Sequence, residues 1–349
     1  MTPKQIIPLL CLLVLQSAAA CAQATTQTDH SIGDVGQAQF DFASEDIHEL
    51  SGITYLGEDR FAVVSDKGGK FGIATIDIDR KTGKIIGAKL SETRVLQGGR
   101  DIEDLAFDPS TRRLITVDEA DQSFAHHDLN SGERIEAIPG PIVFKQARPN
   151  LGFESLSASP HAGSIWAANE EPLKCDGPRA TQEEGALIRL QRFNHDLKPD
   201  GQFAYRVDPH RGSDNLLGRA QSGVSGLVAL PNGQLIVMER ELGGALLPTL
   251  RIGLYLIDTM EATDTSKLDS LVDIDVKPVA KTLLYTFNAG PANFEGITLG
   301  PKLDSGDYTL ILVSDDGGGK RNPQNLLSLR IAGSLVESMK KDINRSIKD

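Results

Sequence analysis

Short apolar runs recur along the chain, each bounded by polar or turn residues. In five segments a polar or acidic pair comes first, an alternating apolar run and a turn follow, and a second apolar run ends at an acidic residue. Two short apolar runs around a turn predict a β-hairpin. These five segments begin at Glu49, Asp101, Gly152, Gly223 and Asn293. The repetition therefore predicts one structural unit used several times.

The spacing of the repeats indicates how many strands each unit holds. The equivalent opening positions are Ser51, Glu103, Glu154, Ser225 and Glu295, separated by 52, 51, 71 and 70 residues. The intervals contain further strand candidates at residues 71–79, 186–193, 252–259 and 326–333, with outer strands at "ERIEAI" and "KTLLYTF". About four strands per repeat predict an all-β fold, a β-propeller of five or six antiparallel blades. The two longer intervals hold either an extra blade or long loops.

The two ends of the chain differ in composition from the repeats. Residues 1–24 carry Lys4 and the apolar run Ile6–Leu15, which predict a signal peptide and a secreted or periplasmic protein. A lipoprotein signal with Cys21 as the lipid anchor is the alternative. Residues 25–45 are expected to be a leader in which Ala38–Phe42 closes the ring by pairing near Leu326. The propeller domain is expected over 46–335 and a charged C-terminal tail over 336–349, as a short helix or solvated.

The formal net charge of −12 makes nucleic acid an unfavourable partner, because nucleic-acid binders are usually basic. No stretch is long and apolar enough to predict a transmembrane segment. Beyond the predicted signal only Cys175 remains, so no intramolecular disulfide is expected. We expect a monomer that acts on a small molecule.

The repeated acids are the candidate chemistry. Equivalent residues of a propeller form a ring around its axis, so the acids that open or close each segment should face one another. The expected metal ligands are Asp66, Glu103, Asp104, Glu119, Glu154, Glu170, Glu239, Glu295 and Asp315. Clustered carboxylates raise each other's pKa, and hard cations with oxygen ligands relieve the repulsion. This favours Ca²⁺, or another divalent cation, over zinc, since the histidines show no zinc-ligand spacing.

Basic residues follow several of these acids. Lys67, Arg240 and Lys320 are placed to hold an anion. Carboxylates, a metal and Lys or Arg together suit hydrolysis of a phosphate ester, with Glu154 and Glu295 also in the catalytic set. Acids at strand ends are also common as solvated turn residues, and the repeated pair could instead cap each inner strand. A non-catalytic ligand- or protein-binding propeller and a lactonase-like propeller hydrolase are therefore the alternatives.

The segments "ELSGITY", "DIEDLAFD", "GFESLSASP", "GVSGLVAL" and "NFEGITLG" also resemble a known family. Together with "VSDDGGGKRNP" they make the chain, from about Ile47 to Ile331, similar to the phytase-like family of secreted bacterial proteins, "esterase-like activity of phytase". The resemblance implies a β-propeller and hydrolysis of phosphate or other esters. It also implies an acidic, calcium-bearing mouth like that of metal-dependent propeller phosphatases.

Overall fold

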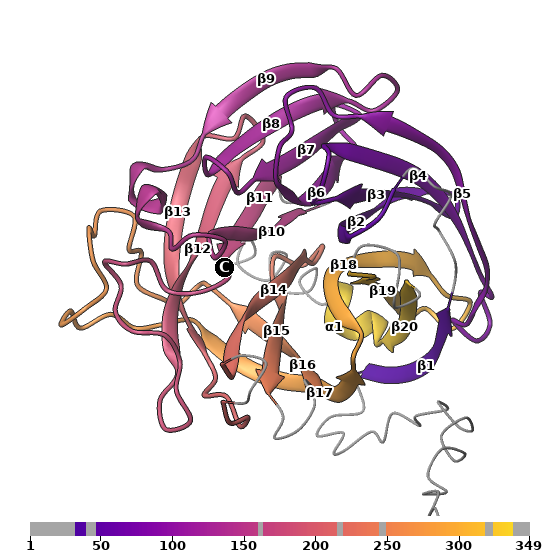
Figure 1. Cartoon of the computed structure of the whole chain (residues 1–349). Coiled ribbons are helices and arrows are strands. Elements are labelled where there is room, and N and C mark those ends of the chain that lie inside the picture. Colours follow the sequence, from indigo (N-terminus) through magenta and orange to yellow (C-terminus); the bar gives the residue numbers. More distant parts are fainter. Residues whose placement is uncertain are drawn as a thin grey trace, which may run out of the picture.

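The computed structural model describes residues 32–39, 47–159, 163–214, 219–243, 249–317 and 324–337. They form five separate sheets of four antiparallel strands, arranged as blades around a common axis (Figure 1). The predicted all-β propeller is confirmed, and the number of blades is five. Among the described residues, the one α-helix is far too short to cross a membrane.

Each blade runs from the axis outward in chain order. The first blade holds β2 (Leu50–Gly57), β3 (Arg60–Ser65), β4 (Lys70–Ile78) and β5 (Ile85–Val95). The second holds β6 (Ile102–Asp108), β7 (Arg113–Asp118), β8 (Ser123–Asp128) and β9 (Arg134–Pro139), followed by the 3₁₀ helix η1 (Ile142–Gln146). The third holds β10 (Phe153–Ala158), β11 (Ser164–Asn169), β12 (Ala186–Asn194) and β13 (Pro199–Val207). The fourth holds β14 (Gln221–Ala229), β15 (Leu235–Gly243), β16 (Thr249–Asp258) and β17 (Ala280–Gly290).

The last blade is completed by both ends of the described chain. It contains β18 (Asn293–Lys302), β19 (Tyr308–Asp315), β20 (Asn325–Ile331) and, outermost, β1 (Ile32–Gln39). The antiparallel pairing of β1 with β20 includes Ala38 opposite Leu326, so an N-terminal strand does close the ring. That strand begins earlier than the predicted Ala38–Phe42. The short helix α1 (Gly333–Glu337) follows β20.

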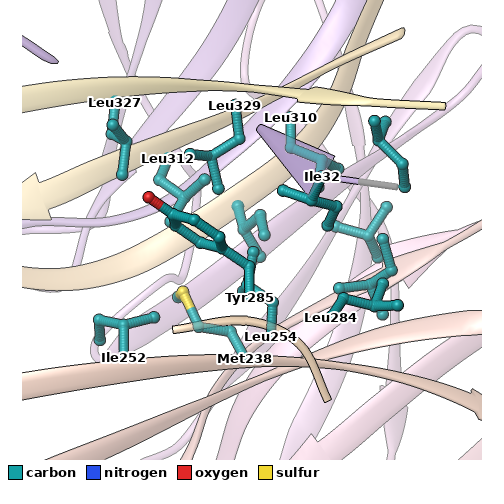
Figure 2. Close-up of a cluster of buried hydrophobic side chains, with 14 of the residues drawn as sticks. Ile32, Met238, Ile252, Leu254, Leu284, Tyr285, Leu310, Leu312, Leu327 and Leu329 are labelled. Carbon is teal, nitrogen blue, oxygen red and sulfur yellow. The ribbon is translucent and has the colours of Figure 1, made fainter. Parts of the chain in front are cut away.

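The apolar core is divided among the five interfaces between blades. Figure 2 shows the largest cluster, where Met238, Ile252 and Leu254 of the fourth blade meet Leu310 and Leu329 of the fifth. Four further clusters fill the other interfaces. Because a middle strand is covered on both faces, it reads as a continuous apolar run, and "FAVV" of β3 is wholly buried. Burial of these apolar clusters fixes each blade against the next.

The two longer repeat intervals hold long loops instead of an extra blade. Residues 170–185 connect β11 to β12, and residues 259–279 connect β16 to β17. A fully buried ion pair joins them: Arg189 of β12 donates from Nε and Nη2 to Asp176 over 2.7 Å each. Arg189 also donates to Leu268 O, and Asp176 accepts from Leu271 N. One guanidinium therefore fixes both insertions to the third blade.

The sequence, in which His126 and His127 stand next to Asp128, predicts a position on a blade surface for this pair, and that prediction is wrong. Both lie on β8 and are buried, at 4% and 1% exposed. The ring nitrogens of His127 lie 3.2 Å from Thr116 Oγ1 and 3.3 Å from Gly132 O. Burial lowers the pKa of both histidines, so they are neutral parts of the blade interior at neutral pH.

Asp176→Asn should destabilise the protein by about 3–5 kcal/mol, because it leaves the Arg189 guanidinium buried without a counter-charge. Chemical denaturation measures this loss. Asp200→Asn is the control: Asp200 pairs with Arg192 at 3.3 Å, but its side chain is 60% exposed. The control should cost less than about 1 kcal/mol. Equal losses in the two variants would show that the buried pair does not hold the insertions.

Candidate functional site

The five innermost strands share one irregularity. β2, β6, β10, β14 and β18 each have a register shift near their start, where two residues oppose one on the neighbouring strand. The residues skipped by the pairing are Ser51, Glu103, Glu154, Ser225 and Glu295. A β-bulge redirects a side chain without interrupting its sheet. The five positions that the repeats align in sequence are therefore also equivalent in the structure.

Serine and glutamate use the bulge differently. The hydroxyl of Ser51 donates to Ile102 O, 2.9 Å away on the next blade. Ser225 does the same with Phe294 O at 3.3 Å. The three glutamates, in contrast, lie close enough to interact electrostatically with one another at one mouth of the channel. Two bulges therefore bind neighbouring blades together, and three present carboxylates.

The residue that follows each bulge lies where two neighbouring inner strands are in contact. A Cβ on Gly52 would lie 2.3 Å from Asp104 Oδ1, and a Cβ on Gly296 would lie 3.0 Å from the Gly52 carbonyl carbon. Asp104 occupies this place in the second blade. Its two oxygens accept from Leu105 N and from Leu156 N of the third blade, each over 2.8 Å. Asp104, a predicted metal ligand, does not join the acidic mouth, because one oxygen bonds the backbone of its own strand and the other joins β6 to the third blade.

We call the acids gathered at this end of the channel the acidic mouth. They come from the bulges, the ends of the second strands and the turn before β6, and they are Asp66, Asp101, Glu103, Glu119, Glu154, Glu170, Glu295 and Asp315. Asp101, Glu103 and Glu119 form the tightest group, with one oxygen from each lying within 4.8 Å of the others. Glu119 Oε1 also accepts from Gly152 N. This group has the oxygen donors that a hard cation prefers.

Arg240 of β15 occupies the other side of the acidic mouth. It donates to Glu295 Oε1 at 2.6 Å and to Glu170 Oε1 at 2.7 Å, and its Nη2 lies 3.6 Å from Glu154. Asn293 accepts from the same guanidinium and donates to Glu295. Burial alone would lower the pKa of Arg240, but the three carboxylates raise it. Arg240 is thus a fixed counter-ion that orients three glutamates.

Burial and mutual repulsion make the acids hard to ionise. Burial, then Glu295, Glu119 and Asp101, raise the pKa of Glu103 to about 9. Burial raises the pKa of Glu119 to about 7, against the Gly152 hydrogen bond. Burial also raises the pKa of Glu295 to about 7, with Arg240 opposing, and places that of Glu154 well above its usual range. Such groups are ready to exchange protons near neutral pH or to accept a cation.

A cleft of about 350 Å³ opens beside the tightest acid group. Asp101 and Glu119 line one side, and Lys145 and Arg148, from the β9–β10 connection, line another. Arg148 forms part of the cleft wall, since its guanidinium donates to Pro172 O and Gly177 O. Lys145 is exposed. The cleft gives a small molecule access to the acids and offers an ammonium group for an anion.

The structure brings together most of the predicted site residues. Lys67 is 61% exposed, and its Nζ lies 2.8 Å from Asp66 and 3.7 Å from Asp101. Glu239 is outside the acidic mouth: its carboxylate accepts from Lys281, Tyr205 and Asp208 N between the third and fourth blades. Lys320 lies outside the described residues.

Three residues at the site were not predicted from the sequence: Asp101, Asn293 and Lys145. Asp101 and Asn293 each stand two residues before a bulge glutamate, and this spacing could have indicated them. Lys145 lies outside the repeats, where the sequence gives no comparable signal.

Residues 45–318 match the sequence model of the phytase-like family, described as "Esterase-like activity of phytase". The chain belongs to the phytase-like family. A comparison with curated proteins finds no match. Among solved structures, this phytase-like chain is similar to a streptogramin B lyase, with 11% identity, 84% of this chain and 97% of that chain covered, and a TM-score of 0.35. It is also similar to the Myceliophteria thermophila Cps50 (Swd1) β-propeller domain, with 10% identity, coverage of 80% and 96%, and a TM-score of 0.33. Similarity at these levels supports no inference about the activity of the phytase-like chain.

Without divalent cations, the stability of this phytase-like protein should fall as pH rises from about 4.5 to about 9. Glu103 has a pKa near 4.5 when unfolded and about 9 when folded, so the folded state binds its proton more tightly. This contribution is fully present below the unfolded pKa and is lost as pH passes the folded one. Glu103→Gln removes the titration, so in chelator at pH 8 it should melt higher than wild type, by roughly 2 °C per kcal/mol of repulsion removed.

Thermal melts of both proteins at pH 5 and pH 8 test this. Glu92→Gln, which changes an exposed acid paired with Arg94 on β5, is the control and should match wild type at both pH values. A difference between Glu103→Gln and wild type that does not change with pH would contradict the expected role of Glu103.

Proposed function

We propose that this propeller is a cation-dependent hydrolase of phosphate esters or related esters, with its active centre at the acidic mouth. The observation that supports this most is the group Asp101, Glu103 and Glu119, whose oxygens lie within 4.8 Å beside an open cleft. The description of the phytase-like family points in the same direction.

The residues present suit a hard divalent cation. The donor set consists of carboxylates, and burial disfavours the charged form of Glu103 and Glu119, a cost that a cation offsets. Asp101, Glu103 and Glu119 would hold the cation, and Ca²⁺ is our first candidate. When bound, it would polarise a phosphoryl or carbonyl oxygen as a Lewis acid and balance developing negative charge.

Residues of the chain itself would carry out proton exchange and binding of the substrate anion. Glu295, with its pKa near 7, is the group best placed to exchange a proton at neutral pH, and Arg240 keeps it oriented. Because Arg240 is already bound by glutamates, holding the substrate anion falls to Lys67 and Lys145. This replaces the phosphate-holding role that the sequence suggested for Arg240.

A lactonase-like activity on neutral esters is the second candidate. It is favoured by the binding of Arg240 to Glu154, Glu170 and Glu295, which leaves the mouth rich in unmatched negative charge. A neutral ester would meet less repulsion there than a phosphate ester. Secretion or a periplasmic location, the possible lipid anchor at Cys21 and the monomeric state remain predictions.

Removal of the cation should abolish hydrolysis and lower the melting temperature. The test measures the metal content of the protein, then its melting temperature and turnover of p-nitrophenyl phosphate and a lactone before and after chelation. We expect Ca²⁺ to restore both properties in wild type and in Glu92→Gln, and to restore neither in Glu103→Gln or Glu119→Gln. Bound calcium without turnover of either substrate would instead indicate a non-catalytic binding propeller.

Lys145→Met should separate the two candidate substrate classes. If Lys145 pairs with a substrate anion, its loss should raise KM for p-nitrophenyl phosphate about tenfold, the equivalent of 1.4 kcal/mol, and leave KM for a neutral lactone unchanged. Lys198→Met is the control, since Lys198 is exposed after β12 and pairs with Asp196 at 3.9 Å. An unchanged KM for the phosphate ester would remove Lys145 from the site.

A further inference from the structure

The channel has a second opening at the opposite end of the inner strands, and its walls are largely apolar. A cavity of about 400 Å³ there is lined by all five inner strands, β2, β6, β10, β14 and β18. Its apolar lining includes Ile53, Leu105, Phe107, Leu156, Val228 and Ile297. We call this cavity the apolar mouth. Its volume is in the range of small-molecule sites, which combine apolar walls with a few polar groups that orient the ligand.

The repeats also bring polar groups into this cavity. The residues three places after the five bulge positions all line it, and they are Thr54, Ala106, Ser157, Val228 and Thr298. Three of the five inner strands therefore place a hydroxyl group at the same level of the channel.

Each of the three hydroxyl oxygens accepts one backbone N–H from the next inner strand around the ring. The bonds run from Phe107 N to Thr54 at 3.1 Å, from Ala229 N to Ser157 at 2.9 Å and from Tyr55 N to Thr298 at 3.3 Å. A hydroxyl group also has one hydrogen of its own to donate. Among the described residues, none accepts that hydrogen from any of the three. The apolar mouth therefore offers three O–H donors to an occupant.

The charged group at the apolar mouth is already paired. Of the described residues that line the cavity, only Lys302 is charged, and its Nζ donates to Glu337 Oε1 at 2.7 Å. Tyr308, which also lines the cavity, donates its hydroxyl to the same oxygen at 2.5 Å. A carboxylate or phosphate on a ligand would lose its hydration here without gaining a free counter-charge, which is unfavourable. The lining therefore favours a neutral ligand.

We propose that the apolar mouth binds a neutral, mainly apolar small molecule, such as a ketone or an ester, whose carbonyl oxygen accepts from the hydroxyl groups of Thr54, Ser157 and Thr298. A carbonyl oxygen accepts hydrogen bonds and brings no donor that would itself need a partner. A pure hydrocarbon would leave the O–H donors without an acceptor, at a cost in affinity. The inference is independent of the chemistry at the acidic mouth, so its failure would leave the proposed function unchanged.

Benzophenone tests both the location and the hydrogen bond, because it is a neutral, apolar ketone that crosslinks to nearby C–H groups under ultraviolet light. With the full chain, irradiation should attach it to peptides containing residues 53–57, 105–109, 156–158, 228–231 or 297–302. The NMR resonance of its isotope-labelled carbonyl carbon should move downfield from its position in an alkane, as a hydrogen bond to the oxygen requires. Absence of binding, crosslinks confined to other regions, or a resonance at the alkane position would overturn the proposal.

Variants that each lack one hydroxyl group give an independent readout. Ser157→Ala and Thr298→Val should each weaken benzophenone binding about two- to tenfold in equilibrium dialysis, the effect of one neutral hydrogen bond. Binding of diphenylmethane, which lacks the carbonyl group, should stay unchanged.

Ser51→Ala is the matched control. Ser51 Oγ joins two inner strands at the acidic end of the channel over 2.9 Å, the same length as the bond at Ser157. This variant should bind both compounds like wild type. Thermal melts establish that each variant is folded, and the wild-type experiment with benzophenone decides the question if one is not. An equal loss for both compounds in the folded test variants, or no loss for benzophenone, would overturn the proposal.

Discussion

The close approach of the five inner strands is the constraint on which the rest of this structure depends. Neighbouring strands leave so little room that Gly52 and Gly296 have no space for a Cβ, and Asp104 reaches straight across to the backbone of the third blade. The bulge before each of these positions aims a side chain toward the axis. Serine there binds the next blade, whereas glutamate must share the mouth with other glutamates. The raised pKa of Glu103 and Glu154 is a direct consequence of this packing.

Repetition made the architecture predictable from the sequence. The hairpins share one order of parts, which is a polar opening, an apolar strand, a turn and a second apolar strand. Blades, strand order and even the closing strand near Ala38 could therefore be expected. The blade count stayed open because a longer interval can hold either a blade or a loop. In the structure the longer intervals hold loops that Arg189 fixes to the third blade. An arginine between apolar residues gives no sequence signal of its buried pair with Asp176.

The candidate site was harder to predict because adjacent residues of a strand point to opposite faces. Glu239 and Arg240 were both expected at the mouth, but Arg240 reaches it while Glu239 turns to Lys281 and Tyr205 between two blades. Glu103 and Asp104 separate in a similar way at their bulge. The pair His126 and His127 is hard to place for a different reason: polar residues suggest exposure, but a blade buries both faces of its middle strands.

Charge is balanced unevenly across the acidic mouth, and this asymmetry argues for where a cation would bind. Arg240 offsets part of the negative charge of Glu154, Glu170 and Glu295 with a buried guanidinium. On the other side, the ion-pair partner of Asp101 among the described residues is the exposed Lys67, 3.7 Å away, and a solvated ammonium compensates a half-buried carboxylate poorly. Glu103 and Glu119 lie on that same side. A divalent cation there would do for these three acids what Arg240 does for the others, and it would do so beside the cleft through which a substrate could approach.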